Sequence, residues 1–170
     1  IYAEGRQCID EIQGRGVPIA QGYGENIWNP PPALEQEVRR LYEDAKVSLW
    51  TELTNSDVET VPMAMPLYTQ AKDRRDYVYH PESGEKLSVH SIESLQGFRQ
   101  NWGSTVPDVQ LVISDGLNVR ALMDEGHLLP FLTDLCQQLE AEGLRLSPRN
   151  LVITYGRVRA GYMVGEVLFG

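Results

Sequence analysis

Two short apolar runs in the second half of the chain constrain its fold more than any other feature. They are residues 109–113 and residues 151–154, both rich in valine, isoleucine and leucine without a regular alternation of apolar and polar positions. Strands of this kind are buried on both faces, as in open parallel sheets that helices cover. Each run is followed by a polar loop, residues 114–117 and residues 155–158. Because ligands of such sheets bind outside the carboxyl ends of the strands, we expect a site at these two loops.

A helical pattern separates the two runs. Apolar residues recur at intervals of three and four over residues 127–142, and Gly143 ends the pattern. The order strand, helix, strand, with the usual right-handed crossover, places both loops at the same edge of the sheet. We therefore expect an α/β fold in which helices flank a mostly parallel, Rossmann-like sheet.

The first seventy residues are expected to form a helical N-terminal segment. The sequence predicts a short helix over residues 1–13, an irregular loop over 21–32 and a long amphipathic helix over 33–53. Residues 54–70 contain two prolines and no clear period, so we expect a linker or a surface loop and place a domain boundary there. The two predicted domains are residues 1–70, the helical or linking segment, and residues 71–170, the α/β domain.

Three further elements are predicted between this boundary and the first buried strand. Residues 77–79 favour a short strand, and residues 81–84 favour a turn. Residues 88–102 have apolar side chains at the spacing of an amphipathic helix.

Composition and motifs argue against several classes of function. The 24 acidic residues exceed the 15 basic ones, and the net charge of -9 argues against nucleic acid or an anionic membrane as a partner. No apolar stretch approaches about 20 residues, and no charged-then-apolar leader is present, so we expect a cytoplasmic protein without a membrane span. Cys8 and Cys136 form neither a disulfide framework nor a metal pattern. The chain also lacks the turn of a hydrolase nucleophile and the ligand spacing of a zinc site, so no catalytic residue and no metal site are predicted.

The residues of the two loops suit a polar ligand. Gly116 and Gly156 allow a ligand to approach the main chain closely. Ser114 and Asp115 add a hydroxyl and an acceptor, and Arg157 adds a forked cationic donor for a carboxylate, a phosphate or an amide. A second interpretation stays open, in which Asp115 caps the following turn and Arg157 pairs with a surface acid.

Three motifs in this part of the chain resemble a known family. The run Asp-Val-Gln-Leu-Val-Ile-Ser-Asp-Gly-Leu at residues 108–117, the Tyr-Gly-Arg-Val motif at residues 155–158 and the later Gly165-Glu166 pair are similar to the light subunit of ethanolamine ammonia-lyase. Residues at the spacing of that family's lead-in segment are Asp73, Tyr77, Pro81, Gly84 and Leu87. The resemblance covers roughly residues 71–170.

The resemblance implies part of an adenosylcobalamin-dependent lyase that converts ethanolamine to acetaldehyde and ammonia. In that family a large barrel subunit carries the substrate and the radical chemistry, and the light subunit covers the cobalamin held between them. By the same resemblance, Val158 touches the corrinoid. The loop residues that build the rest of this cover are Tyr155, Gly156, Arg157, Ser114, Asp115 and Gly116. None of them is expected to act as a catalytic acid, base or nucleophile.

The implied partner is the large subunit, or a large-subunit domain fused to this chain, in a hetero-oligomer or an oligomer of fused chains. Residues 1–70 are similar to the tail of large subunits in fused variants. Family members continue beyond the Gly165-Glu166 segment, so we expect a domain truncated at its C-terminus and a fragment that is inactive alone. The implied location is the cytoplasm, free or inside a bacterial microcompartment. Two alternatives remain: a noncatalytic interaction module, and a nucleotide-binding domain that uses the same loops for phosphate.

Overall fold

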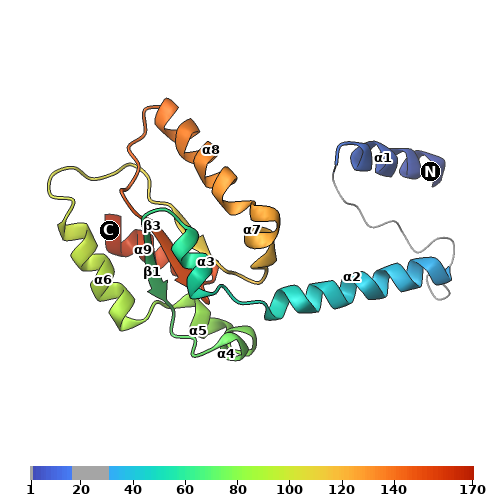
Figure 1. Ribbon diagram of the computed structural model, residues 1–170, viewed down its shortest axis with the longest axis horizontal. Helices are drawn as coiled ribbons and strands as arrows, with labels where there is room; N and C mark the ends of the chain where they lie inside the picture. Colours follow the sequence, from blue (N-terminus) through green and yellow to red (C-terminus); the bar gives the residue numbers. More distant parts are fainter. Residues whose placement is uncertain (1, 17–30) are drawn as a thin grey trace. The chain divides into compact units, whose positions relative to one another are not determined.

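A computed structural model describes residues 2–16 and 31–170, and the chain divides into two units, Ile1–Ala45 and Lys46–Gly170 (Figure 1). The first unit contains α1 (Tyr2–Gly14) and most of α2 (Pro32–Trp50). These helices confirm the two that the sequence predicts in this region. The irregular loop expected over residues 21–32 lies almost wholly outside the described residues.

The second unit is built on a small parallel sheet. Its strands are β1 (Ala64–Tyr68), β2 (Val112–Ser114) and β3 (Asn150–Thr154). β3 lies between the other two, in the order β1-β3-β2, and both pairings are parallel. The two apolar runs of the sequence therefore form neighbouring strands, although β2 is shorter than its run.

Helices cover both faces of this sheet (Figure 1). The helices of the second unit are α3 (Asn55–Thr60), α4 (Arg74–Tyr79), α5 (Pro81–Glu85), α6 (Val89–Gln100), α7 (Arg120–Met123), the 3-10 turn η1 (Asp124–Gly126), α8 (Leu128–Ala141) and α9 (Val158–Phe169). On one face, α6 and α9 pack against Leu151 and Ile153 of the central strand. On the other face, α8 packs in the same cluster as Val152. All three residues are fully buried, so β3 is covered on both sides, as its apolar sequence predicts.

The α/β prediction is thus confirmed, and the finer prediction of a Rossmann-like sheet is not. A parallel sheet of three strands with helices on both faces agrees with the general class. Its small size and its β1-β3-β2 order do not establish the Rossmann-like arrangement.

The expectation of a linker or surface loop over residues 54–70 is wrong. This stretch contains α3 and β1, and β1 pairs with β3 along its whole length. Pro66 is compatible with β1 because β1 is an outer strand, where one side of the backbone needs no partner.

The predicted strand at residues 77–79 is also wrong, because these residues are helical. Asp73 precedes α4, and its carboxylate accepts a hydrogen bond from the Asp76 amide at 2.7 Å, which caps the helix. The turn predicted at residues 81–84 is a short helix, α5, with Pro81 in its first turn. The predictions over residues 88–102 and 127–142 are confirmed by α6 and α8.

An exposed ion pair joins the segments that lead into β2 and β3. The Asp108 carboxylate accepts hydrogen bonds from the Arg145 amide at 2.9 Å, from its Nε at 2.9 Å and from its Nη2 at 3.0 Å. These bonds lower the pKa of Asp108 from its ordinary 3.8 to about 2. The folded protein therefore holds this proton less tightly than the unfolded chain does.

We expect the free energy of unfolding to decrease as the pH falls from about 4 to about 2, because protonation of Asp108 removes the charge that Arg145 binds. Asp108→Asn should weaken this dependence, whereas Asp134→Asn, at an exposed position of α8, should retain it. Urea midpoints measured at several pH values in this range would test both variants. An unchanged slope in Asp108→Asn would contradict the assignment.

Candidate functional site

A cavity of about 530 Å³ opens at the carboxyl ends of β2 and β3. Ser114 at the end of β2 and Gly116 in the following loop line it. On the other side, Gly156 and Arg157 after β3 and Val158 at the start of α9 contribute to the lining. The remaining lining residues are Tyr77, Val112, Leu117, Ile153 and Gly161. The two loops therefore meet at one edge of the sheet, where the sequence places them.

Direct hydrogen bonds hold the two loops together. The Ser114 hydroxyl donates to the Gly156 carbonyl at 2.6 Å, and the Gly156 amide donates to Asp115 Oδ1 at 3.1 Å. Both loops also turn sharply, because Gly116 and Tyr155 have left-handed backbone conformations with φ of 47° and 56°. For a tyrosine this conformation is uncommon, so tertiary contacts must hold it.

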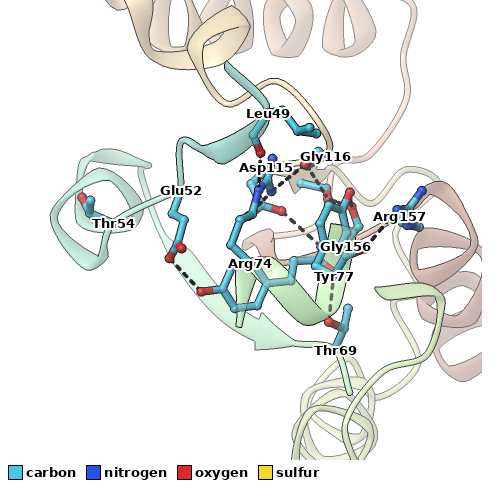
Figure 2. A network of polar contacts seen from close by, with 12 residues as sticks. Leu49, Glu52, Thr54, Thr69, Arg74, Tyr77, Asp115, Gly116, Gly156 and Arg157 are labelled. Carbon is cyan, nitrogen blue, oxygen red and sulfur yellow. Dashed lines mark hydrogen bonds and ion pairs between the residues drawn. The ribbon is translucent and has the colours of Figure 1, made fainter. Parts of the chain in front are cut away.

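Asp115 does not line the cavity but binds the residues that hold the two loops in place. Its side chain is fully buried, and Oδ2 lies 3.6 Å from Nη1 of Arg74 (Figure 2). Burial raises the pKa of Asp115, while backbone amides and the Arg74 guanidinium act in the opposite direction. Each carboxylate oxygen of Asp115 thus has a partner: the Gly156 amide bonds to Oδ1, and the Arg74 guanidinium pairs with Oδ2.

Arg74 connects three separate parts of the second unit. Its Nε donates to the Leu49 carbonyl at 2.7 Å, and its Nη1 donates to the Gly116 carbonyl at 2.8 Å (Figure 2). The guanidinium also lies over the Tyr77 ring, 4.8 Å from its centroid. Sequence reasoning missed this residue, because nothing local distinguishes Arg74 from its exposed neighbour Arg75.

Tyr77 lines the cavity together with Arg157. The Tyr77 hydroxyl donates to the Gly156 carbonyl at 3.3 Å, and burial raises its pKa. The Arg157 guanidinium stacks on the Tyr77 ring, 4.7 Å from the ring centroid, and Arg157 Nη2 donates to the Tyr77 carbonyl at 3.0 Å. Among the described residues, Arg157 Nε is a buried donor with no hydrogen-bond partner.

Tyr155, like Asp115, supports the site without lining it. Its hydroxyl donates to Glu52 Oε2 at 2.8 Å, and its carbonyl accepts from the Thr69 hydroxyl at 2.9 Å (Figure 2). Burial, followed by the bond to Glu52, raises the pKa of Tyr155 to about 12. Five of the seven residues predicted from the sequence thus line the cavity, and the other two hold its loops.

The second interpretation of the loops differs from the contacts observed. Asp115 does not cap the turn after β2; its carboxylate binds the Gly156 amide of the other loop. Arg157 donates to a main-chain carbonyl and stacks on Tyr77, so its observed partners are not a surface acid.

Gly156 occupies a position with no room for a side chain. A Cβ atom there would lie 2.5 Å from Ser114 Oγ and 2.7 Å from Ile153 Cγ2. Gly84 is similarly close to the Tyr77 ring, and its carbonyl accepts a hydrogen bond from the Arg157 amide at 2.8 Å. Close backbone packing is therefore what brings the loop after β3 against its neighbours.

Neither a metal-binding cluster nor a membrane-spanning helix is found in the part of the chain that the structure describes. Over residues 2–16 and 31–170, no three histidine, cysteine, aspartate or glutamate side chains are placed to hold a metal ion together. None of the helices described in these ranges is both long and apolar enough to span a bilayer.

Comparisons with known proteins place this site in a family context. The family model described as ethanolamine ammonia-lyase light chain matches residues 13–169. The ethanolamine ammonia-lyase small subunit of Pseudomonas fluorescens (strain Pf0-1) is 38% identical over 102 residues, which are 60% of this chain and 36% of that protein. The small subunit of Pseudomonas putida is 38% identical over 106 residues, 62% of this chain and 37% of that protein. The chain thus spans about a third of the length of the curated relatives it matches.

Proposed function

Because the chain belongs to the ethanolamine ammonia-lyase light chain family, we propose that its cavity forms part of the cover over adenosylcobalamin in such a lyase. The observation that carries the proposal is the meeting of the two loops in one open cavity at the carboxyl ends of β2 and β3. The family's motifs, at residues 108–117 and 155–158, supply most of the lining.

The residues of the cavity fit a large, mainly apolar ligand that carries polar groups at its periphery. Val158 and Leu117 are 74% and 48% exposed, so the rim offers apolar surface without closing the site. Arg157 lines the cavity, and its guanidinium is a suitable donor group for an amide or phosphate acceptor. Corrinoids combine a broad ring with peripheral amides and a phosphate, which matches this distribution.

The proposed role of these residues is to hold and shield the cofactor. When bound, adenosylcobalamin supplies the radical chemistry, and the surrounding protein orients it and excludes water. The one acidic side chain of the two loops, Asp115, is turned away from the cavity and paired with Arg74. Its position supports the proposal that this chain contributes no catalytic acid or base.

The proposal includes a partner that carries the substrate. Conversion of ethanolamine to acetaldehyde and ammonia would take place in a large subunit, or in a fused large-subunit domain, beneath the cavity rim. The assembled enzyme would be a hetero-oligomer or an oligomer of fused chains. We propose the cytoplasm as its location, with enclosure in a bacterial microcompartment as an additional feature of the same proposal.

Titration with adenosylcobalamin, with and without the large subunit, tests this function. We expect a change in the cobalamin absorption spectrum in the mixture. No change in the mixture, together with binding of ATP, would replace the proposal by a nucleotide-binding domain. No change, with co-elution of the two polypeptides in gel filtration, would leave only an interaction module.

Val158→Glu tests the contact within the assembled enzyme. A carboxylate at this rim position would be desolvated against the corrinoid, so we expect the dissociation constant to increase by at least about tenfold, or about 1.4 kcal/mol. Val89→Glu is the matched control, because Val89 is 69% exposed at the start of α6 and does not line the cavity. Equal affinities of the Val158 and Val89 variants would overturn the assigned contact.

A further inference from the structure

Thr69 lies where the pairing of β1 with β3 ends. The last main-chain pair joins Tyr68 to Thr154, and both strands stop at these residues. One position further on, the Thr69 hydroxyl donates to the Tyr155 carbonyl at 2.9 Å (Figure 2). A side-chain hydrogen bond thus takes the place of the next main-chain pair between the two segments.

The position of Thr69 is fixed independently of the cavity loops. Thr69 is 5% exposed, and an isolated antiparallel bridge pairs it with Leu87. The adjacent Gln70 amide donates to the Lys86 carbonyl at 2.9 Å. The Thr69 hydroxyl also accepts from the Ala71 amide at 3.3 Å, which restricts its rotation. This hydroxyl is therefore a fixed donor to the segment after β3.

Tyr155 needs such a restraint, because its backbone is in the left-handed region with φ of 56°. Bulky side chains rarely adopt this conformation, and it persists only where surrounding contacts enforce it. A free Tyr155 would relax to an extended or a right-handed helical conformation, which would redirect the chain that follows. The Thr69 bond opposes this relaxation, since it holds the carbonyl of the strained residue itself.

The residues directly after this turn bring the loop to the cavity. The Gly156 amide donates to Asp115 Oδ1 at 3.1 Å, and the Gly156 carbonyl accepts from the Ser114 hydroxyl at 2.6 Å. The Arg157 amide donates to the Gly84 carbonyl at 2.8 Å. Gly156 and Arg157 both line the cavity, so a change of backbone direction at the preceding residue would displace two lining residues together.

We propose that Thr69 is a positioning residue of the cavity, which acts through Tyr155 by holding the strained turn that directs Gly156 and Arg157 toward the ligand. Thr69 itself does not line the cavity. A hydroxyl can donate to the Tyr155 carbonyl and accept from the Ala71 amide at once, so serine should replace Thr69. Valine has the same shape but no hydroxyl, so it should not. The inference rests on the proposed function only for the identity of the ligand.

Hydrogen exchange of single amides in the full chain, without ligand, tests the positioning role. The Leu151 amide is the reference, because it donates to the Leu111 carbonyl within the sheet. In Thr69→Val we expect the protection of the Gly156 amide, relative to that of Leu151, to fall at least about tenfold. General destabilisation would lower the protection of both amides alike. An unchanged ratio of the two protection factors would therefore overturn the proposal.

Thr69→Ser is the conservative variant and should restore the parent ratio. Thr133→Val is the matched control, because it removes an exposed hydroxyl that donates to a main-chain carbonyl within α8, and it should leave the ratio unchanged. A serine variant that behaves like the valine variant would overturn the proposal, since packing of the methyl group would then explain the effect. Where Thr69→Val does not fold, Thr69→Ala supplies the same comparison.

Tyr155→Asn tests whether Thr69 acts through the strained turn. Asparagine adopts the left-handed conformation more readily than tyrosine, so the turn would depend less on the Thr69 bond. In this background we expect Thr69→Val to lower the relative protection of Gly156 by less than about threefold. A loss as large as that without the Tyr155 substitution would show that the hydroxyl only satisfies a carbonyl. That result would overturn the positioning role.

Binding of adenosylcobalamin by the assembled enzyme gives the functional measurement. We expect Thr69→Val to raise the dissociation constant at least about fivefold, and Thr69→Ser to leave it within about twofold of the parent value. Parent-like affinity in Thr69→Val would overturn the proposal. If the parent enzyme binds no adenosylcobalamin, the proposed function fails, and the exchange measurements alone decide the role of Thr69.

Discussion

Arg74→Met is expected to lower the free energy of unfolding by about 3–5 kcal/mol, the cost of leaving one partner of a buried ion pair without the other. Arg74 and Asp115 are 2% and 1% exposed, so water cannot replace the lost guanidinium. The substitution also removes the hydrogen bonds to the Leu49 and Gly116 carbonyls. Urea unfolding followed by circular dichroism would measure the change.

Arg159→Met provides the matched control for this prediction. Arg159 pairs with Glu85 at 2.8 Å, but its side chain is 72% exposed, so we expect a loss of less than about 1 kcal/mol. The double variant Arg74→Met/Asp115→Asn should lose less unfolding free energy than the sum of the two single variants. Each single variant leaves one buried charge unpaired, whereas the double variant leaves none. Additive effects, or an Arg74→Met loss as small as that of the control, would contradict the role assigned to the pair.

Gly156→Ala is expected to destabilise the second unit by about 1–3 kcal/mol through overpacking. The added methyl group would meet Ser114 Oγ and Ile153 Cγ2 at 2.5 and 2.7 Å, and Ile153 belongs to the rigid central strand. The loop after β3 must then move away from Ser114, which lengthens the 2.6 Å hydrogen bond between the two loops. We expect weaker ligand binding to accompany the loss of stability.

Gly97→Ala controls for the general effect of replacing glycine by alanine. Gly97 lies in α6 with no atom within 4 Å of an added Cβ, so alanine should leave stability unchanged or raise it by up to about 1 kcal/mol. Thermal unfolding of both variants would give the comparison. Equal stability of Gly156→Ala and the parent would show that the loop adapts without cost.

The sequence predicts β2, β3 and the loops that follow them because the causes are local. An uninterrupted apolar run at residues 151–154 requires burial on both faces, and the following glycine and polar residues require a turn. The meeting of the two loops then follows from parallel pairing and the handedness of the connection. Both features therefore depend only on neighbouring residues and on general rules of sheet topology.

The remaining features depend on distant contacts that no local pattern contains. The sequence does not predict β1, because Pro66 interrupts an otherwise apolar strand. This proline is compatible with the sheet only because β1 is an outer strand. The residue types at Asp115 and Arg157 indicate a polar site, but only the fold determines their directions. Arg74, contributed by α4, turns Asp115 inward, and Tyr77 of the same helix receives Arg157.

The main-chain character of the contacts between the loops has an evolutionary consequence. Between the loops, the Gly156 amide donates to Asp115 and the Gly156 carbonyl accepts from Ser114. The Gly116 and Tyr155 carbonyls accept hydrogen bonds from Arg74 and Thr69, which lie outside both loops. The conformation of the loops therefore depends on their backbone atoms and a few buried side chains. Val158 and Leu117 line the cavity but are largely exposed, so they contribute little to packing. Selection can exchange these two side chains to suit a different ligand at little cost to folding, so the rim is where family members with different binding preferences should diverge first.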